Sequence, residues 1–334
     1  MISVRITSKG MLIGYMLAVA LACILPFNAG EYWVRLMNAA LIAAVAVMGL
    51  NFVLGYTGQI SLMHASVAGI GAYAVAITST RLGLNPWVGV VIGVSAAGLF
   101  SYAMGMLLLR LKGHYFALAT LGVNISFTIV AANWVEVTGG SNGITGIPVL
   151  SAFGVAADSE QAFFYVGLFM VGILAAFAYY IRQTPVGRSM MAVRDDELAA
   201  SVSGLNLTRV KVAALTLGGI YAGCAGVLFA FHARFVAPED FSIGQSIFYL
   251  AMLVVGGEAT ILGSILGALT ITFLPEWLRP LGSTYLVVFG LIVVAMLFVA
   301  PKGMAGLFGV LREKFGSQSS AEKEEKWRFS KSGQ

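Results

Sequence analysis

The sequence predicts an all-α fold, a polytopic bundle of transmembrane helices. Hydrophobic residues make up 59% of the chain and charged residues only 10%, whereas a soluble domain carries roughly a quarter charged residues. Apolar stretches recur along the chain, and they have the length that a helix needs to cross a bilayer, about 20 residues. The short alternating segments typical of a membrane β-barrel are absent from the sequence.

We expect about ten spans, within a transmembrane domain that covers residues 1–312: 11–29, 34–54, 62–80, 87–109, 114–133, 162–181, 210–231, 245–257, 260–275 and 283–300. The first follows Arg5 and Lys9, as a signal peptide would. More membrane segments come after it, so we expect an uncleaved span. The eighth and ninth are short and flank the run 256–260, which fits a helical hairpin or two broken helices. Eight spans plus two re-entrant segments are therefore the alternative.

Basic residues divide unevenly between the two sets of loops. If the N-terminus is cytoplasmic, the cytoplasmic segments receive Arg5, Lys9, Arg110, Lys112, Arg182, Arg188, Arg194, Arg209, Lys211, Lys302, Arg312 and Lys314. The other side receives Arg35, Arg81, Arg234 and Arg279 with most of the acids. The positive-inside rule then predicts both termini in the cytoplasm and an even number of crossings. The same rule explains the net charge of +5, so we expect no nucleic-acid partner.

Two loops are long. Residues 134–161 face outside in this topology and are rich in Gly, Ser and Asn, and residues 182–209 form a polar cytoplasmic loop. The segment 313–334 is charged and Ser-rich, and we expect a disordered cytoplasmic tail there.

The sequence contains no catalytic signature. It has no Gly-x-x-x-x-Gly-Lys-Ser/Thr phosphate loop, no metal-spaced His/Cys cluster and no Gly-x-Ser-x-Gly elbow. We therefore expect no enzyme activity, no metal and no cofactor in this chain. The predicted spans hold almost no ionisable groups, whereas ion-coupled carriers usually keep such groups inside the membrane. Energy for any transport is expected to come from other chains.

The run 49–66 combines glycines with uncharged hydrogen-bonding side chains at membrane depth: Asn51, Tyr56, Thr57, Gln59, Ser61 and His64. Such groups are costly against lipid and usually face protein or a water-filled path. Helix packing and a solute pathway explain them equally well.

The run 111–122 enters a predicted helix in which Phe116, Thr120 and Asn124 repeat every four residues and share one face. Tyr115 precedes them. An aromatic group followed by two uncharged polar groups suits a small amphipathic solute, and it also suits packing.

The cytoplasmic loop contains a short amphipathic helix. The acids Asp195, Asp196 and Glu197 favour a helix N-terminus, Leu198, Ala199 and Val202 form an apolar face, and Gly204 ends the helix. It is either an ordinary interfacial helix or one that docks into a groove on another subunit.

Together these runs resemble branched-chain amino acid ABC permeases of the LivM type. The resemblance covers about 34–308 and includes 138–148, 194–206 and the C-terminal run Pro301-Lys302-Gly303. It implies an ABC importer permease fold and four kinds of partner: a second homologous permease, two ATP-binding subunits that bind the ATP, a periplasmic substrate-binding protein and membrane lipid.

The resemblance also assigns roles to residues. The stretch 194–206 is similar to the family's Glu-Ala-Ala loop, so ATPase coupling is expected from Gly187, Arg188, Arg194, Asp195, Asp196, Glu197, Ala199, Ala200 and Gly204. Leu198 stands where the strict motif has Glu, and 256–260 departs from the family's Gly-Gly-x-Gly-Ser by a carboxylate and a lost glycine. The expected cargo is a branched-chain or related amino acid. Urea, amides or aromatic acids are the alternatives within the family, and an ion-coupled amino acid carrier is the alternative outside it.

Overall fold

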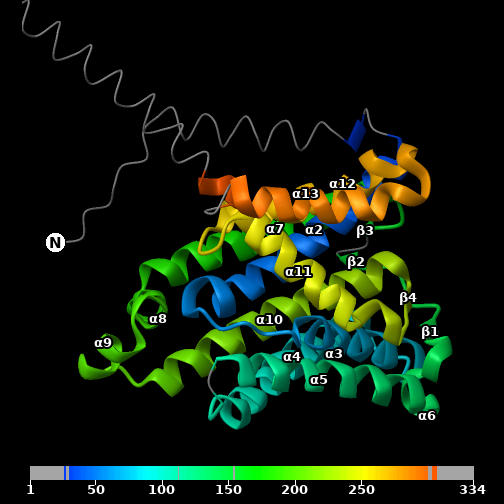
Figure 1. Ribbon diagram of the computed structural model, residues 1–334. Helices are drawn as coiled ribbons and strands as arrows, with labels where there is room; N and C mark the ends of the chain where they lie inside the picture. The colour runs from blue at the N-terminus through cyan, green and yellow to red at the C-terminus, as the bar shows by residue number, and fades with distance from the viewer. Residues whose placement is uncertain (1–25, 28–29, 112, 153–154, 300–302, 307–334) are drawn as a thin grey trace, which may run out of the picture.

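The computed structural model describes residues 26–27, 30–111, 113–152, 155–299 and 303–306, and within them the predicted all-α bundle is confirmed (Figure 1). Six of its helical segments are long and apolar enough to cross a membrane, and two shorter apolar helices accompany them. The predicted first span, 11–29, falls almost entirely outside the described residues, as does the predicted tail, 313–334. The count of ten spans stays a prediction.

The first half of the bundle consists of α2 (Glu31–Leu50), the π-helical η1 (Asn51–Gly55), α3 (His64–Ala76), the π-helical η2 (Ile77–Arg81), α4 (Pro86–Leu108) and α5 (His114–Asn133). The loop that follows holds α6 (Val135–Thr138), η3 (Gly140–Asn142), β1 (Ile144–Thr145), β2 (Ser151–Ala152) and β3 (Val155–Ala156).

The second half consists of α7 (Glu160–Gln183), α8 (Pro185–Asp195), α9 (Glu197–Val202), α10 (Leu207–Ala233), β4 (Phe235–Val236), η4 (Pro238–Phe241), α11 (Ile243–Gly256), α12 (Ile261–Leu278), η5 (Arg279–Thr284) and α13 (Tyr285–Val299). The strands form only two-residue pairs, β1 with β4 and β2 with β3, both antiparallel.

Helices α2 and α10 form the centre of the bundle. Helix α2 packs against α7, α10, α11 and α12, and α10 packs against α3 and α4 as well. In Figure 1 α3, α4 and α5 lie along one side and α12 and α13 along the other. Both central helices are rich in Ala, Val and Gly with almost no polar face, so they bury most of their surface, as all-round apolar helices do.

Small residues bring α4, α3 and α10 into close contact. The buried residues of α4 are all small: Gly89, Gly93, Ala97, Gly98, Ser101 and Gly105. On α10, a Cβ added at Gly226 would overlap the carbonyl oxygen of Ala68 in α3. Membrane helices associate through close backbone packing of this kind, because lipid supplies no hydrophobic driving force between them.

Replacing Gly226 with alanine is therefore expected to destabilise the protein by about 1–3 kcal/mol, the usual cost of overpacking. Gly172 of α7 is the matched control, since a Cβ there meets nothing within 4 Å. Thermal unfolding in detergent should show a lower midpoint for Gly226→Ala and an unchanged or higher one for Gly172→Ala. Equal midpoints would contradict the close α3–α10 contact.

The helix ends gather at two opposite poles of the bundle. The α9 pole is named for its outermost helix. A cavity there is lined by Gly58, Gln59, Ile60, Leu109, Leu111, Gly113, His114, Phe116, Glu197 and Lys211. At the β1 pole, β1 pairs with β4, Asn38 donates to Glu160, and Arg81 donates to the carbonyl of Val135. Figure 1 shows α8 and α9 at one end and β1, β4 and α6 at the other. The long loop 134–161 and the loop 182–209 therefore lie at opposite poles, as the alternation of spans requires.

Helices α11 and α12 form an antiparallel hairpin whose turn lies at the α9 pole. A Cβ on Gly256 would overlap the carbonyl oxygen of Gly263, so the helices touch backbone to backbone. Gly303 packs against the same turn, where a Cβ on Gly303 would overlap the backbone of Gly257. This contact explains why glycine follows Pro301-Lys302 in the C-terminal run.

Candidate functional site

Part of the polar run 49–66 lies alongside α5, the helix that carries Phe116, Thr120 and Asn124. Gln59 and Phe116 line one cavity at the α9 pole. One turn further along, the backbone N–H of Leu62 donates to Thr120 Oγ1 at 3.0 Å. One turn beyond that, Ser246 Oγ of α11 accepts from the N–H of Ala65 at 3.0 Å and from Asn124 Nδ2 at 3.1 Å. We call this row of contacts the α5 seam.

The prediction that Phe116, Thr120 and Asn124 share a face is confirmed, because all three are buried while α5 as a whole is mostly exposed. Thr120 and Asn124 have no exposed surface. Their face meets the irregular segment 58–63, which precedes α3. Irregular backbone between membrane helices is tolerated where protein groups satisfy it. Here Thr120 accepts from the N–H of Leu62, and Ser246 accepts from the first-turn N–H of Ala65 in α3.

Ser246 is a residue of the candidate site that the sequence motifs missed. It lies in the short apolar helix α11 and is fully buried. One serine in a mostly apolar helix is a weak signal. Its partners Ala65 and Asn124 are more than 120 positions away.

The other predicted pathway residues have separate positions. Asn51 hydrogen-bonds to the turn between α11 and α12. Thr57 donates to the carbonyl of Val53 and accepts from Gln59. His64 Nε2 lies 2.7 Å from the carbonyl oxygen of Ala46, which is a packing position. Ser61 and Tyr56 are buried, whereas Tyr115 is 73% exposed and points away from the seam.

Three of these residues carry buried polar atoms that have no hydrogen-bond partner within the described part of the chain: Tyr56 Oη, Gln59 Oε1 and Asn124 Oδ1. An unpaired buried polar atom costs about 1–3 kcal/mol, and native proteins contain few of them. Water, a solute or a second conformation can satisfy such atoms.

The coupling stretch 187–204 forms two helices, where a single short one was expected. Asp196 is extended between them (φ −157°, ψ 110°) and caps α9 by accepting from the N–H groups of Leu198 and Ala199. The predicted helix start at these acids is confirmed, and Gly204, at φ +87°, lies just beyond the helix end. Lys211 Nζ pairs with Glu197 at 2.5 Å and joins α9 to α10.

The side chains of this stretch point in different directions. Leu198 is 79% and Val202 is 88% exposed, so α9 presents an apolar surface outward. Ala199, Asp195 and Arg188 are exposed too, whereas Gly187 and Ala200 are buried. Arg194 reaches back into the bundle and donates to the carbonyl of Gly55.

The runs 49–66 and 111–122 and the coupling stretch 187–204 all contribute residues to the cavity at the α9 pole. Its volume is about 160 Å³, and Gln59, Phe116 and Glu197 contribute to its lining together with His114 and Lys211. The cavity lies at the Phe116 end of the α5 seam. It therefore connects the candidate pathway residues to the candidate coupling residues.

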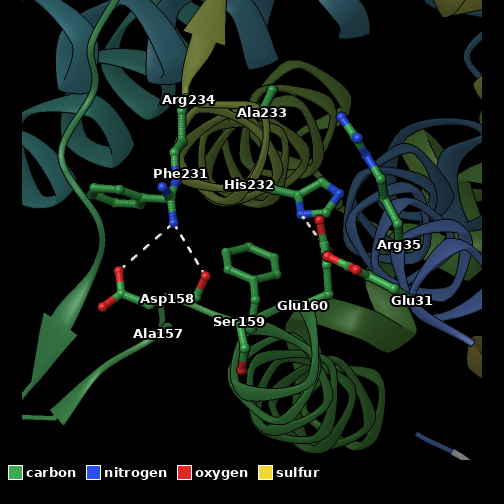
Figure 2. Close-up of a pocket in the computed structure, with 11 residues that line it drawn as sticks. Glu31, Arg35, Ala157, Asp158, Ser159, Glu160, Phe231, His232, Ala233 and Arg234 are labelled. Atoms are coloured by element: carbon green, nitrogen blue, oxygen red, sulfur yellow. Dashed lines mark hydrogen bonds and ion pairs between the residues drawn. The ribbon is translucent and has the colours of Figure 1, made fainter.

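A second pocket, of about 300 Å³, lies at the β1 pole between α2, α7 and α10 (Figure 2). Arg234 points toward Asp158, with 3.7 Å between nitrogen and carboxylate oxygen, and His232 Nδ1 lies 3.6 Å from Glu160 Oε2. Asn38 Nδ2 also donates to Glu160 at 2.8 Å. These contacts of Arg234, Asp158, Glu160 and Asn38 join the ends of α2, α7 and α10.

Comparison with known protein families identifies the class of protein to which this chain belongs. Residues 32–301 match the family model described as the permease component of branched-chain amino acid transport systems. The chain belongs to this permease family. It is a permease subunit of an ABC importer and an integral membrane protein.

The curated relatives that match this chain are permease proteins as well. The permease is 32% identical to the high-affinity branched-chain amino acid permease protein LivM of Salmonella typhimurium, over 84% of this chain and 71% of the relative. It is 30% identical to LivM of Escherichia coli, over 85% and 72%. The fructose import permease protein FrcC of Rhizobium meliloti is 26% identical over 80% of this chain and 78% of its own. No solved structure matches the permease significantly.

Proposed function

We propose that this permease imports branched-chain amino acids or closely related small amphipathic solutes. The two LivM relatives above support the cargo, because they match the permease over more than four-fifths of its length. Relatives with sugar names, FrcC and the L-arabinose permease protein AraH of Azospirillum brasilense, are 26–27% identical. A sugar is therefore the second candidate cargo.

The proposed assembly contains four kinds of chain. The permease is also 26% identical to LivH of Escherichia coli over 91% of that relative, which supports pairing with a second, LivH-like permease. Two ATP-binding subunits bind and hydrolyse the ATP, and a periplasmic protein delivers the solute.

In the proposed orientation the α9 pole is cytoplasmic and the β1 pole is periplasmic. Six described basic residues, Arg110, Arg182, Arg188, Arg194, Arg209 and Lys211, belong to the α9 pole, whereas four, Arg35, Arg81, Arg234 and Arg279, belong to the β1 pole together with acids such as Glu31, Glu136, Asp158, Glu160 and Glu239. This distribution follows the positive-inside rule. Both termini are then cytoplasmic and the number of spans is even, as in a bacterial inner-membrane protein with ten spans.

The proposed solute route includes the α5 seam. Its uncharged polar groups suit an amphipathic solute, and the unpaired atoms of Gln59 and Asn124 need partners. Because the seam is buried here, the route is closed at this depth. Movement of α5 away from segment 59–65 and α11 opens it.

The proposed coupling element is α9. Its exposed Leu198 and Val202 are anchors for a groove on an ATP-binding subunit, and the Glu197–Lys211 pair transmits the movement of α9 to α10. Amphipathic helices commonly dock into grooves in this manner.

Uptake by the assembled transporter tests the cargo. In liposomes that contain all partner chains, we expect ATP-dependent accumulation of labelled leucine, with competition by isoleucine and valine and none by fructose or L-arabinose. Competition by the sugars alone would reject the amino acid assignment. Accumulation driven by an ion gradient without the ATP-binding subunits would identify a secondary carrier.

A further inference from the structure

Arg194 joins three segments that are far apart in the sequence. It lies at the end of α8, where one guanidinium nitrogen donates to the carbonyl oxygen of Gly55 at 2.5 Å and the other pairs with Glu258 at 2.9 Å. Gly55 ends the π-helical η1, and Glu258 lies in the turn between α11 and α12. The planar guanidinium suits this double contact, because its fork of donors serves two acceptors at once.

The same two segments are joined a second time by Asn51 of η1. Its Oδ1 accepts from the N–H of Ala259 at 2.8 Å, and its Nδ2 donates to the carbonyl of Thr260 at 3.2 Å. Ala259 is left-handed, at φ +58°, a conformation that is unfavourable for a residue with a Cβ. The turn is therefore held in a specific shape by contacts from η1.

We propose that the contacts of Arg194 with Gly55 and Glu258, which we call the Arg194 bridge, couple the motion of the cytoplasmic helices to the membrane bundle. Through the bridge, a displacement of α8 and α9 pulls on η1 and on the α11–α12 turn together. Helix α11 carries Ser246 of the α5 seam, so the displacement reaches the solute route. Arg194 and Glu258 are positioning residues, and this role rests on the function proposed above.

The features of the bridge fit a contact that breaks and re-forms. Each side chain is 32% exposed, so solvent screens the pair and its contribution to stability is small. The π-helical geometry of η1 is a further feature, since π-bulges inside α-helices are frequent at functional sites. Asn51, by contrast, is buried and holds the turn when the bridge opens.

The test uses the fully assembled transporter in liposomes and measures solute uptake and ATP hydrolysis together. In Arg194→Gln and Glu258→Gln, we expect uptake per ATP hydrolysed to fall about threefold to thirtyfold, the range for residues that carry coupling between sites. The exchanged pair R194E/E258R should recover only the part of the loss that the ion pair carries, because a carboxylate at position 194 cannot donate to the carbonyl of Gly55. Arg209→Gln is the matched control, because Arg209 is an exposed arginine at the same pole whose side chain contacts neither Gly55 nor Glu258, and it should leave the ratio unchanged.

Cross-linking supplies a second measurement. In a background of Cys23→Ser and Cys224→Ala, the pair R194C/E258C is linked by a short thiol reagent. Blocked uptake that a reductant restores is expected if the bridge must open. Wild-type uptake in the linked protein, or an unchanged uptake-to-ATP ratio in both single variants, would overturn the proposal. If the unmodified assembly itself shows no ATP-driven uptake, the proposed function fails instead.

Discussion

Replacing both Leu198 and Val202 with glutamate is expected to abolish ATP-driven uptake. These side chains are the most exposed large apolar groups of the described chain, at 79% and 88%, and they lie one turn apart on α9. An apolar anchor at an interface typically contributes about 2–4 kcal/mol. Loss of two anchors, with carboxylates in their place, should weaken docking of the ATP-binding subunit by more than about a hundredfold.

The folded permease should tolerate this change. Neither side chain packs against the bundle, so the thermal unfolding midpoint and membrane insertion are expected to stay the same. Leu198→Met and Val202→Ile keep the apolar surface and serve as controls with normal uptake. Co-purification with the ATP-binding subunits measures docking directly. Uptake and co-purification at wild-type levels in the glutamate variant would show that α9 is an ordinary interfacial helix.

Part of this arrangement is predictable from local sequence. The four-residue spacing of Phe116, Thr120 and Asn124 fixes a common face on any α-helix, and the structure buries all three. Asp196 is a favourable N-cap residue, so the start of α9 follows from the residues on either side of it. Both inferences need only helix geometry and local hydrogen bonding.

The long-range pairings are not predictable in this way. Helices α2 and α10 have no polar face, so their sequences do not specify which neighbours cover them. The side-by-side alignment of 59–65 with α5, and the contribution of Ser246, depend on that packing. Arg194 illustrates the same limit, because its place in a motif similar to an ATPase-contacting loop predicts an outward side chain, whereas its partners are Gly55 and Glu258.

Asn124→Leu is expected to lower uptake at least tenfold and to change the preference among solutes. The leucine removes the hydrogen bond to Ser246 and the unpaired Oδ1 atom, and it fills space at the seam. A change of about one methylene in a substrate-binding surface alters discrimination by about 10–200-fold. The ratio of leucine to valine uptake should therefore shift even where total uptake is low. Ser126→Ala, an exposed polar position on the same helix, should alter neither quantity.

This ratio separates the two interpretations of the seam. If Asn124 only fastens α5 to α11, its replacement lowers the amount of stable protein, and each remaining molecule discriminates between solutes as before. If the solute passes Asn124, the discrimination itself changes, because the side chain contributes to the barrier that each solute crosses. The burial of the seam is compatible with passage, since an importer must close its route in part of the cycle. Unpaired oxygen atoms on Gln59 and Asn124 are then the cost of the closed state, and the open state satisfies them with water or with the solute's own polar groups.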